Sequence, residues 1–304
     1  MTATRKSEVN RALTRIRQFA QRPWSGKKNA VSSRWARFLD GIPTPIRLPY
    51  GAWWLARNDA LGRVLLGDGF ENAERCFVER FLQPGMIVLD IGAHHGFYTL
   101  LASKRVGPLG KTISFEPSPR ERRALRLHLL LNGCRNVVVE GLALGNEDTE
   151  TDLYVVGDFG SGCNSLRPPD VPGGTSNLRV HINRLDTWLA KRSVGSIDFI
   201  KLDVEGAELD VLKGASQLLQ RRPRPVILAE VQDVRTRPWG YRAKDIIDHL
   251  ANRGYKWFGL SDGGYVEDLD VGANDFEGNF VACPDELVDV LRHLSTGKEP
   301  AAGE

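Results

Sequence analysis

The segment Met86–Gly96, M-I-V-L-D-I-G-A-H-H-G, restricts the fold of this chain more than any other stretch. Its apolar residues Met86–Leu89 predict a short strand buried in a parallel sheet. Gly92 and Gly96 predict a tight turn, because glycine adopts backbone conformations that other residues rarely adopt. An apolar pattern with the period of a helix begins at Phe97. Strand, glycine turn and helix in this order are typical of a nucleotide-type binding site.

The spacing of the glycines indicates a ligand without phosphates. A dinucleotide site has the pattern G-x-G-x-x-G, with a glycine beneath the pyrophosphate. Here the pattern is D-x-G-x-x-x-G, and Ala93, His94 and His95 fill the middle positions. S-adenosylmethionine (SAM), an adenosine joined through a sulfonium to an amino acid, is a ligand that tolerates these side chains. An ordinary strand–helix turn and another nucleotide are the alternatives.

Four acidic residues are expected at the carboxyl ends of predicted strands: Asp90, Glu116, Asp203 and Glu230. Ligands of parallel α/β sheets bind beyond these strand ends, so we expect the four carboxyl groups to converge. Glu116 lies 20 residues after Gly96, an offset at which an acid accepts hydrogen bonds from the two hydroxyls of a ribose. A ligand with amine, hydroxyl and sulfonium groups suits such an edge.

Strands alternate with helices along the chain, which predicts an α/β fold of the doubly wound, Rossmann-like type with helices on both faces. The sheet is expected to be mostly parallel and seven-stranded, preceded by an N-terminal extension. A hairpin is expected around the turn Tyr50-Gly51, and a helix over residues 70–82. The seven expected strands cover residues 86–90, 112–116, 137–140, 197–202, 225–230, 255–260 and 278–282, with an additional strand at 151–156.

The chain divides into four expected segments. They are a basic N-terminal helix and linker (1–33), a substrate or cover segment (34–84), a main ligand-binding domain (85–294) and a mobile tail (295–304). Within the main domain, residues 157–178 contain five glycines and three prolines and are expected to form a loop without regular structure. The centre of this loop is predicted to be a lid over the ligand, and a plain surface loop is the alternative.

The charge is unevenly distributed. Residues 1–35 carry nine Lys and Arg against Glu8 alone, whereas the net charge of the whole chain is only +3. The remainder is therefore mildly acidic, and we expect no nucleic acid partner for it. Apolar residues at helical spacing within 1–30 predict a basic amphipathic helix, suited to peripheral contact with an anionic membrane or an acidic partner. A terminal helix that lies on its own domain is the alternative.

The four cysteines are scattered and include no C-x-x-C pair. This pattern disfavours a disulfide framework and a zinc site, and it is typical of the reducing cytoplasm, so we predict no metal and a cytoplasmic location. Neither a membrane-spanning apolar run nor a secretory signal is expected.

Several blocks of the chain together resemble the FkbM-type SAM-dependent methyltransferases, a family of the class I methyltransferase superfamily. The most specific block is I-D-F-I-K-L-D-V-E-G-A-E, and the resemblance extends over residues 80 to 285. The blocks that carry it are Val88–Leu100, Phe115–Pro117, Arg184–Trp188, Ile197–Leu209 and Leu212–Ala215.

The resemblance implies methylation of a hydroxyl on a small molecule or glycan, such as a sugar or a secondary metabolite. It also implies roles for residues: Asp203 would face the methionine amine or the incoming hydroxyl. The double histidine His94-His95 departs from the small or polar residues of many family members. The cofactor residues that the resemblance and the glycine turn imply are Asp90, Gly92, His94 and Gly96 for the methionine end, Glu116 for the ribose, and Leu142 and Ala143 for the adenine.

A hydroxyl is a poor nucleophile at neutral pH, so a base that accepts its proton assists the transfer. We predict His95, Asp203 and Glu205 as catalytic candidates, and His181 and Glu230 as further bases. The ordinary pKa of a histidine is the best matched to a base at neutral pH, which favours His95. The alternative is a structural role, in which His95 hydrogen-bonds the backbone at the start of the helix. For Glu205 the alternative is an acid that interacts with the helix dipole.

Two other functions stay open from the sequence. One is an NAD-dependent oxidoreductase, which the missing middle glycine disfavours. The other is a non-catalytic SAM-binding module tethered by its basic N-terminus. The sequence identifies neither the acceptor nor the oligomeric state.

Overall fold

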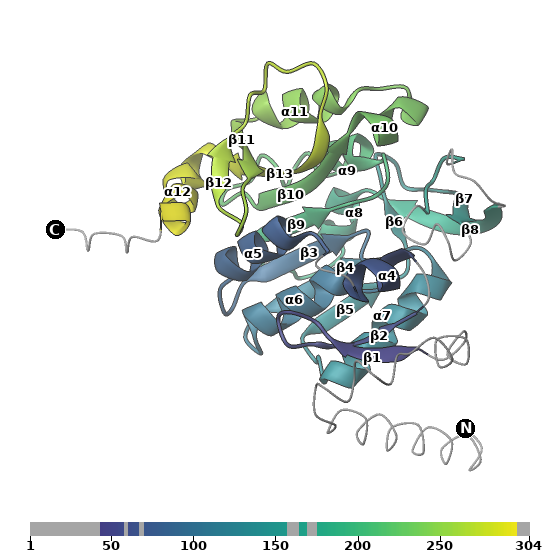
Figure 1. The fold of residues 1–304 in the computed structure, drawn as a ribbon. Helices are drawn as coiled ribbons and strands as arrows, with labels where there is room; N and C mark the ends of the chain where they lie inside the picture. The colour runs from purple at the N-terminus through teal and green to yellow at the C-terminus, as the bar shows by residue number, and fades with distance from the viewer. Residues whose placement is uncertain (1–42, 58–59, 67–69, 157–163, 169–174, 297–304) are drawn as a thin grey trace, which may run out of the picture.

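The computed structural model describes residues 43–57, 60–66, 70–156, 164–168 and 175–296. Its centre is an eight-stranded sheet in the order β12-β11-β13-β10-β9-β3-β4-β5 (Figure 1). The strands from β10 to β5 are parallel, and β13, β11 and β12 extend the sheet in antiparallel pairing. The bounds are β3 (Ile87–Ile91), β4 (Lys111–Phe115), β5 (Val137–Glu140), β9 (Phe199–Leu202), β10 (Val226–Gln232), β11 (Tyr255–Leu260), β12 (Val266–Asp268) and β13 (Glu277–Pro284).

The predicted α/β fold with a mostly parallel sheet is confirmed, and the strand count differs by one. The eighth strand, β12, has only three residues, V-E-D, and pairs antiparallel with β11. It was not predicted, because three residues with a single apolar side chain carry no strand periodicity.

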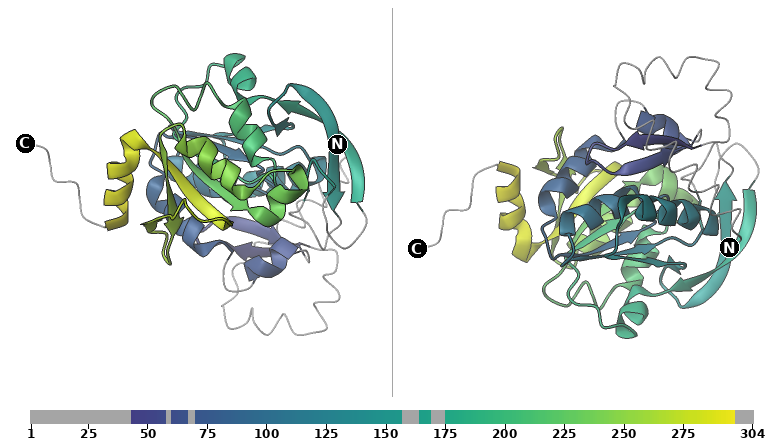
Figure 2. Two further views of the ribbon diagram at one scale, coloured as in Figure 1. Left: turned by 90° about the horizontal axis from the view of Figure 1, so that it is seen from above. Right: turned by 90° about the horizontal axis from the view of Figure 1, so that it is seen from below.

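Helices cover both faces of the sheet (Figure 2). Two separate hydrophobic clusters, one on each face, result from the alternation of side chains along the central strands: Val88 enters one cluster, and Leu89 and Ile91 enter the other. One face carries α5 (Asn72–Phe81), α6 (Phe97–Val106), α7 (Pro119–Asn132) and α12 (Val288–Thr296); the other carries α8 (Leu185–Ala190), α9 (Glu208–Gly214) and α11 (Ala243–Ala251), and α10 (Asp233–Thr236) follows β10.

The entry segment, which is the described part of the predicted substrate or cover segment (34–84), contributes to the hydrophobic cluster that contains Val88. The predicted hairpin is confirmed as β1 (Thr44–Arg47) and β2 (Trp53–Ala56), and an unpredicted helix, α4 (Ala60–Leu66), follows it. Trp54 of β2 is 2% exposed and stacks on His128 of α7 with 3.8 Å between ring centroids. The hairpin therefore packs directly against the α7 side of the sheet.

A small second sheet, in the order β6-β8-β7, lies beside the main one (Figure 1). It contains β6 (Ala143–Leu144), β7 (Thr149–Val156) and β8 (Thr175–Asn183). The expectation of a structureless loop over 157–178 was wrong at its end, since β8 begins at Thr175. The alternating residues Leu178, Val180 and Ile182 carry the sequence signal of this strand. Residues 157–163 and 169–174 of the predicted loop, which include part of the predicted lid at its centre, lie outside the described residues.

The two predicted terminal segments fall largely outside the described part of the chain. The basic helix and linker at 1–33 lie there entirely, as do residues 297–304, whereas Ser295 and Thr296 of the predicted tail belong to α12. Within the ranges that the structure describes, none of the helices combines the length and the apolar character needed to cross a membrane.

Candidate functional site

The glycine turn brings the end of β3 against the end of β9. Gly92 has a φ of +86°, and a Cβ at this position would lie 1.7 Å from the carbonyl oxygen of Asp203. Gly96, with a φ of +91°, is the N-cap of α6. His94 also has a positive φ, of 48°, which is uncommon for a residue with a side chain. This turn therefore requires glycine at position 92 and stores backbone strain at His94.

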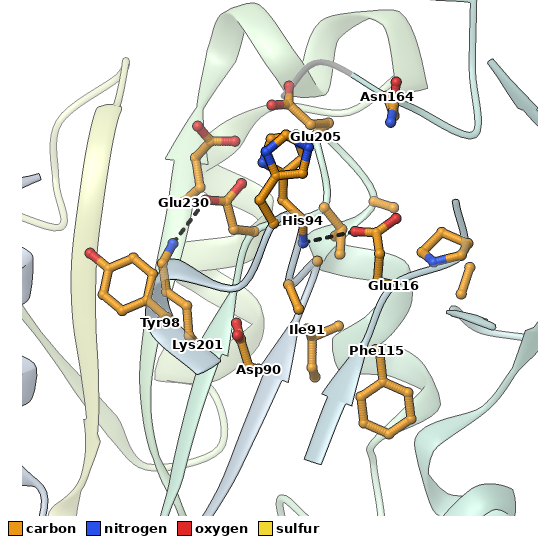
Figure 3. Close-up of a pocket in the computed structure, with 18 of the residues that line it drawn as sticks. Asp90, Ile91, His94, Tyr98, Phe115, Glu116, Asn164, Lys201, Glu205 and Glu230 are labelled. Atoms are coloured by element: carbon orange, nitrogen blue, oxygen red, sulfur yellow. Dashed lines mark hydrogen bonds and ion pairs between the residues drawn. The ribbon is translucent and has the colours of Figure 1, made fainter. Parts of the chain in front are cut away.

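A cavity of about 350 Å³ opens at the carboxyl ends of β3, β4, β9 and β10 (Figure 3). Its lining includes every predicted cofactor and catalytic residue except Gly96, while His181 lies outside it on β8, paired with Glu150. The predicted residues that line it are Asp90, Gly92, His94, His95, Glu116, Leu142, Ala143, Asp203, Glu205 and Glu230.

Glu116 is held by backbone N–H groups at one end of the cavity. Its Oε2 accepts a hydrogen bond from the N–H of His94 and its Oε1 accepts one from the N–H of Ser118, each at 2.8 Å. Burial raises the pKa of Glu116 to about 8, although the two backbone N–H groups oppose the shift. A carboxylate offers about four acceptor positions, so these bonds leave capacity for two more donors, which matches a ribose diol.

Asp90 lies deeper, on β3, and is 2% exposed. The hydroxyl of Thr99 on α6 donates a hydrogen bond to Asp90 and lies 2.9 Å from the hydroxyl oxygen of Ser114. Burial raises the pKa of Asp90 to about 6, and the bond from Thr99 opposes this rise. The carboxyl group is therefore anchored to α6 at the base of the cavity.

Apolar side chains and a short piece of the predicted lid border the same cavity. Asn164 accepts a hydrogen bond from the N–H of Val156 through Oδ1, and the hydroxyl of Ser165 donates to the carbonyl oxygen of Glu205 at 3.1 Å. These bonds tie residues 164–168 to the site. The apolar residues beside them, which provide a surface suited to a flat ring, are Phe115, Pro117, Leu142, Ala143 and Leu153.

An acid cluster, defined as Asp203, Glu205 and Glu230, occupies the other side of the cavity. Carboxylate oxygens of the three residues lie within 4.8 Å of one another. Glu205 forms an ion pair with Arg235 at 3.0 Å. Burial, and then the charge of Asp203, raise the pKa of Glu230 well above its ordinary value. Oxygen donors in this arrangement are suited to a proton, a hydroxyl or a cation.

His95 lies in a different environment from the acid cluster. Its side chain is 7% exposed, and its ring stacks on that of His94 with 4.0 Å between centroids. Burial, with the neighbouring His94, lowers the pKa of His95 to about 2. His94, His95 and Glu121 also form a group whose donor atoms lie within 4.8 Å of one another. The prediction that the chain uses no metal stays a prediction.

Sequence reasoning did not select four polar residues of the cavity: Lys201, Tyr98, Glu71 and Arg235. Lys201 is 2% exposed and its Nζ lies 3.0 Å from Oδ2 of Asp203. The hydroxyl of Tyr98 donates to Oε2 of Glu71 at 2.6 Å. A lysine within the apolar strand I-D-F-I-K-L was an available signal, because a charged residue in a buried strand needs partners.

Comparison with known proteins identifies the family of this chain. The model of the methyltransferase FkbM domain matches residues 90–257, which is more than half of the chain. The chain is 26% identical over 224 residues to the 31-O-demethyl-FK506 methyltransferase FkbM of Streptomyces tacrolimicus, covering 64% of this chain and 84% of that protein. It is 24% identical to the 2-O-methyltransferase NoeI of Sinorhizobium fredii, covering 48% of this chain and 64% of NoeI.

Other similar proteins are longer than this chain. The chain is 26% identical to the AMB antimetabolite synthetase AmbE of Pseudomonas aeruginosa, over 67% of this chain but only 12% of AmbE. The crystal structure of methyltransferase FkbM from Methylobacillus flagellatus KT aligns with a TM-score of 0.39 and 17% identity, over 66% of this chain and 43% of that one. With the family match over the strands and turns that build the cavity, the chain belongs to the FkbM family of SAM-dependent methyltransferases.

Proposed function

We propose that this protein transfers the methyl group of SAM to a hydroxyl oxygen of a small-molecule or glycan acceptor. The observation that carries the proposal is the acid cluster beside the glycine turn: three carboxyl groups within 4.8 Å of one another, in a cavity that also contains Glu116. A hydroxyl acceptor needs a group that accepts its proton, and this cluster supplies it.

The residues of the cavity fit SAM, which supplies a methyl group on a positively charged sulfur when it is bound. Glu116 would accept hydrogen bonds from the ribose, because its two backbone bonds leave acceptor capacity. Leu142 and Ala143 would pack on the adenine. Asp90, Gly92, His94 and Gly96 would hold the methionine end, at the N-terminus of α6.

Glu230 is the base best suited to the transfer, and Asp203 beside it is the second candidate. A carboxylate whose pKa is raised binds a proton more readily, and Glu230 has a raised pKa because it is buried and faces Asp203. Glu205 and Asp203 are both ion-paired, with Arg235 and Lys201 respectively, each at 3.0 Å, so Glu230 is the first candidate. The lowered pKa of His95 opposes proton uptake. The acceptor oxygen forms the new bond to carbon, the carbon–sulfur bond breaks with its electron pair on sulfur, and the proton passes to a carboxylate.

The names of two relatives support an oxygen acceptor: FkbM of Streptomyces tacrolimicus is a 31-O-demethyl-FK506 methyltransferase and NoeI is a 2-O-methyltransferase. The family assignment removes the main reason to consider an NAD-dependent oxidoreductase. A SAM-binding module without catalysis, tethered by residues 1–30, is the second candidate, and turnover distinguishes it from the enzyme.

Binding and turnover test the proposal together. Calorimetry is expected to show SAM binding to the full chain, no measurable binding of NAD, and loss of SAM binding in Asp90→Ala and Glu116→Ala. Glu267→Gln, an exposed acid on β12, is the matched control and should bind like the wild type. Unchanged SAM affinity in both cavity variants would reject the cofactor site.

Turnover is measured as S-adenosylhomocysteine release with a panel of sugars, glycosides and polyketide alcohols, beside matched amines that lack a hydroxyl. Release with a hydroxylated acceptor, reduced in Asp203→Asn and Glu230→Gln, is the expected result. Release only with the amines would refute O-methylation, and tight SAM binding without any release would favour the tethered module.

A further inference from the structure

Lys201 brings a positive charge into the interior of the acceptor side of the cavity. In the register of the sheet it lies beside Asp90 of β3 and Leu228 of β10, so it is central in the sheet and not at its edge. The strand alternation places Lys201 and Asp203 on the same face, while Leu202 enters the opposite hydrophobic cluster. The ammonium group is reached from the cavity and is otherwise enclosed, with 2% of the residue exposed.

The contacts of this ammonium group account for two of its three N–H groups. Nζ donates to Oδ2 of Asp203 at 3.0 Å and to Oδ1 of Asn279 at 3.3 Å. It also lies 5.3 Å from the centre of the Tyr98 ring (Figure 3). Among the described residues, no third hydrogen-bond acceptor of Nζ is found, so one N–H is available to a ligand in the cavity.

The surrounding charges keep Lys201 protonated. Burial acts to lower the pKa of Lys201, but attraction from Asp203, Glu71 and Glu230 outweighs it and the net pKa is raised. The ion pair with Asp203 at 3.0 Å holds Lys201 as a cation, so Lys201 is not the base of the transfer. It is a fixed cation in a cavity whose other charged lining residues are acidic, apart from Arg235.

The acid cluster would otherwise suit a divalent ion. Three carboxyl groups with oxygens within 4.8 Å of one another are the donor type that Mg²⁺ and Mn²⁺ bind. Lys201 already bonds one of these carboxylates, Asp203, and its charge acts on a second, Glu230. An ion bound to Asp203 would lie beside a buried positive charge, which opposes its binding.

We propose that Lys201 replaces a divalent ion in this site: its ammonium group closes the acid cluster to metals and donates its remaining N–H to the acceptor oxygen. This role rests on the proposed O-methylation. A positive charge beside the acceptor hydroxyl favours the oxygen anion that develops as the proton leaves to Glu230 or Asp203. Lys201 stays protonated throughout, so the group transfer itself is balanced as described above, and no metal takes part.

The metal-binding half of the proposal is tested with Mn²⁺ alone. Electron paramagnetic resonance is used to titrate Mn²⁺ into wild type, Lys201→Ala and Lys201→Arg. Lys201→Ala is expected to bind at least tenfold more tightly than wild type, and the charge-conserving Lys201→Arg to bind like wild type. Lys201→Ala with Asp203→Asn should lose the gained site. Binding of S-adenosylhomocysteine by each variant reports that the cavity is folded.

Two results would overturn this half: wild type that binds Mn²⁺ as tightly as Lys201→Ala, or Lys201→Ala that binds S-adenosylhomocysteine but gains no Mn²⁺ affinity. If Lys201→Ala does not fold, Lys201→Met, which retains most of the side-chain volume without the charge, is interpreted by the same two criteria. Because no acceptor is needed, failure here is separate from failure of O-methylation.

The catalytic half uses an acceptor found in the turnover screen. Wild-type turnover should be unchanged by EDTA, and Lys201→Met should lower kcat by about 100-fold, the usual effect of removing one donor to a developing oxygen anion. Added Mg²⁺ should restore turnover in Lys201→Ala and not alter wild type, a response that a purely structural lysine would not give. EDTA-sensitive wild-type turnover, or kcat unchanged in Lys201→Met, would refute the assignment.

Discussion

The protonation of Glu116 should control cofactor affinity near neutral pH. In the empty cavity burial raises the pKa of Glu116 to about 8, so the carboxyl group is largely protonated at pH 7. A ribose diol offers two donors and therefore prefers the carboxylate. Binding then lowers the pKa of Glu116 and releases a proton, which means that affinity rises with pH until the group is ionised in the empty site and levels off above pH 8.

The size of the effect follows from the fraction of empty sites that carry the carboxylate. With a pKa of 8 this fraction is about 1% at pH 6 and about 90% at pH 9, so the dissociation constant should fall about 90-fold between these values. A pKa one unit lower would still give a change of about tenfold. In Glu116→Gln the pH dependence should disappear, and affinity at pH 9 should drop by about 10- to 100-fold, since hydrogen bonds to a charged group are lost.

Calorimetry from pH 6 to 9 with 5′-methylthioadenosine measures the pH dependence that Glu116 gives to ribose binding. This ligand has the ribose diol and lacks the titrating amino-acid part of SAM. Measurements in two buffers of different ionisation enthalpy count the released proton directly. A wild-type affinity that is flat over this range, or a slope that persists in Glu116→Gln, would show that Glu116 does not govern ribose binding.

Two further predictions concern stability. Gly92→Ala places a Cβ 1.7 Å from the backbone oxygen of Asp203 and should lower the urea midpoint of unfolding strongly. The control Gly133→Ala has a similar positive φ but open space around it, and should lower the free energy of unfolding by only about 1 kcal/mol. Equal losses in the two variants would contradict the close approach at Gly92. Hydrogen bonds from Arg224 lower the pKa of Glu286 to about 2, below its ordinary value, so this pair stabilises the fold above about pH 4.5 and loses that effect toward pH 2. Glu286→Gln should therefore lower Tm at pH 7 and have little effect at pH 2, and an equal loss at both values would argue against the pair.

The parts of the fold that the sequence predicts are those with a repeating physical cause. Central parallel strands are buried on both faces and appear as short apolar runs, which is why β3 was evident in the residues before Asp90. The convergence of Asp90, Glu116, Asp203 and Glu230 at one cavity follows from parallel strands having their carboxyl ends on one edge. Topology, and not any single motif, made these positions predictable.

The remaining features depend on contacts between distant segments. The low pKa of His95 comes from burial, and beside it lie Trp54 of the entry hairpin and His128 of α7. The partner Asp203 is two residues from Lys201, but Asn279, which also accepts a hydrogen bond from Lys201, comes from β13, the last strand in chain order. Neither environment is encoded within a window of neighbouring residues, so the ordinary pKa of histidine does not describe His95 in this fold.

The neutral ring of His128 joins the entry hairpin to the glycine turn. The N–H of Leu55 donates to Nε2 of His128 at 3.2 Å, which leaves Nδ1 to carry the proton and donate to the carbonyl oxygen of His95 at 2.8 Å. The hydroxyl of Tyr50 similarly donates to the carbonyl oxygen of Phe97 at 2.7 Å. Residues 43–57 precede residues 90–257, which match the family, yet their hydrogen bonds support the glycine turn at Gly92–Gly96. Replacing this hairpin with that of a relative would therefore also disturb the glycine turn. The turn would be preserved only if the replacement keeps the Leu55–His128 and Tyr50–Phe97 hydrogen bonds.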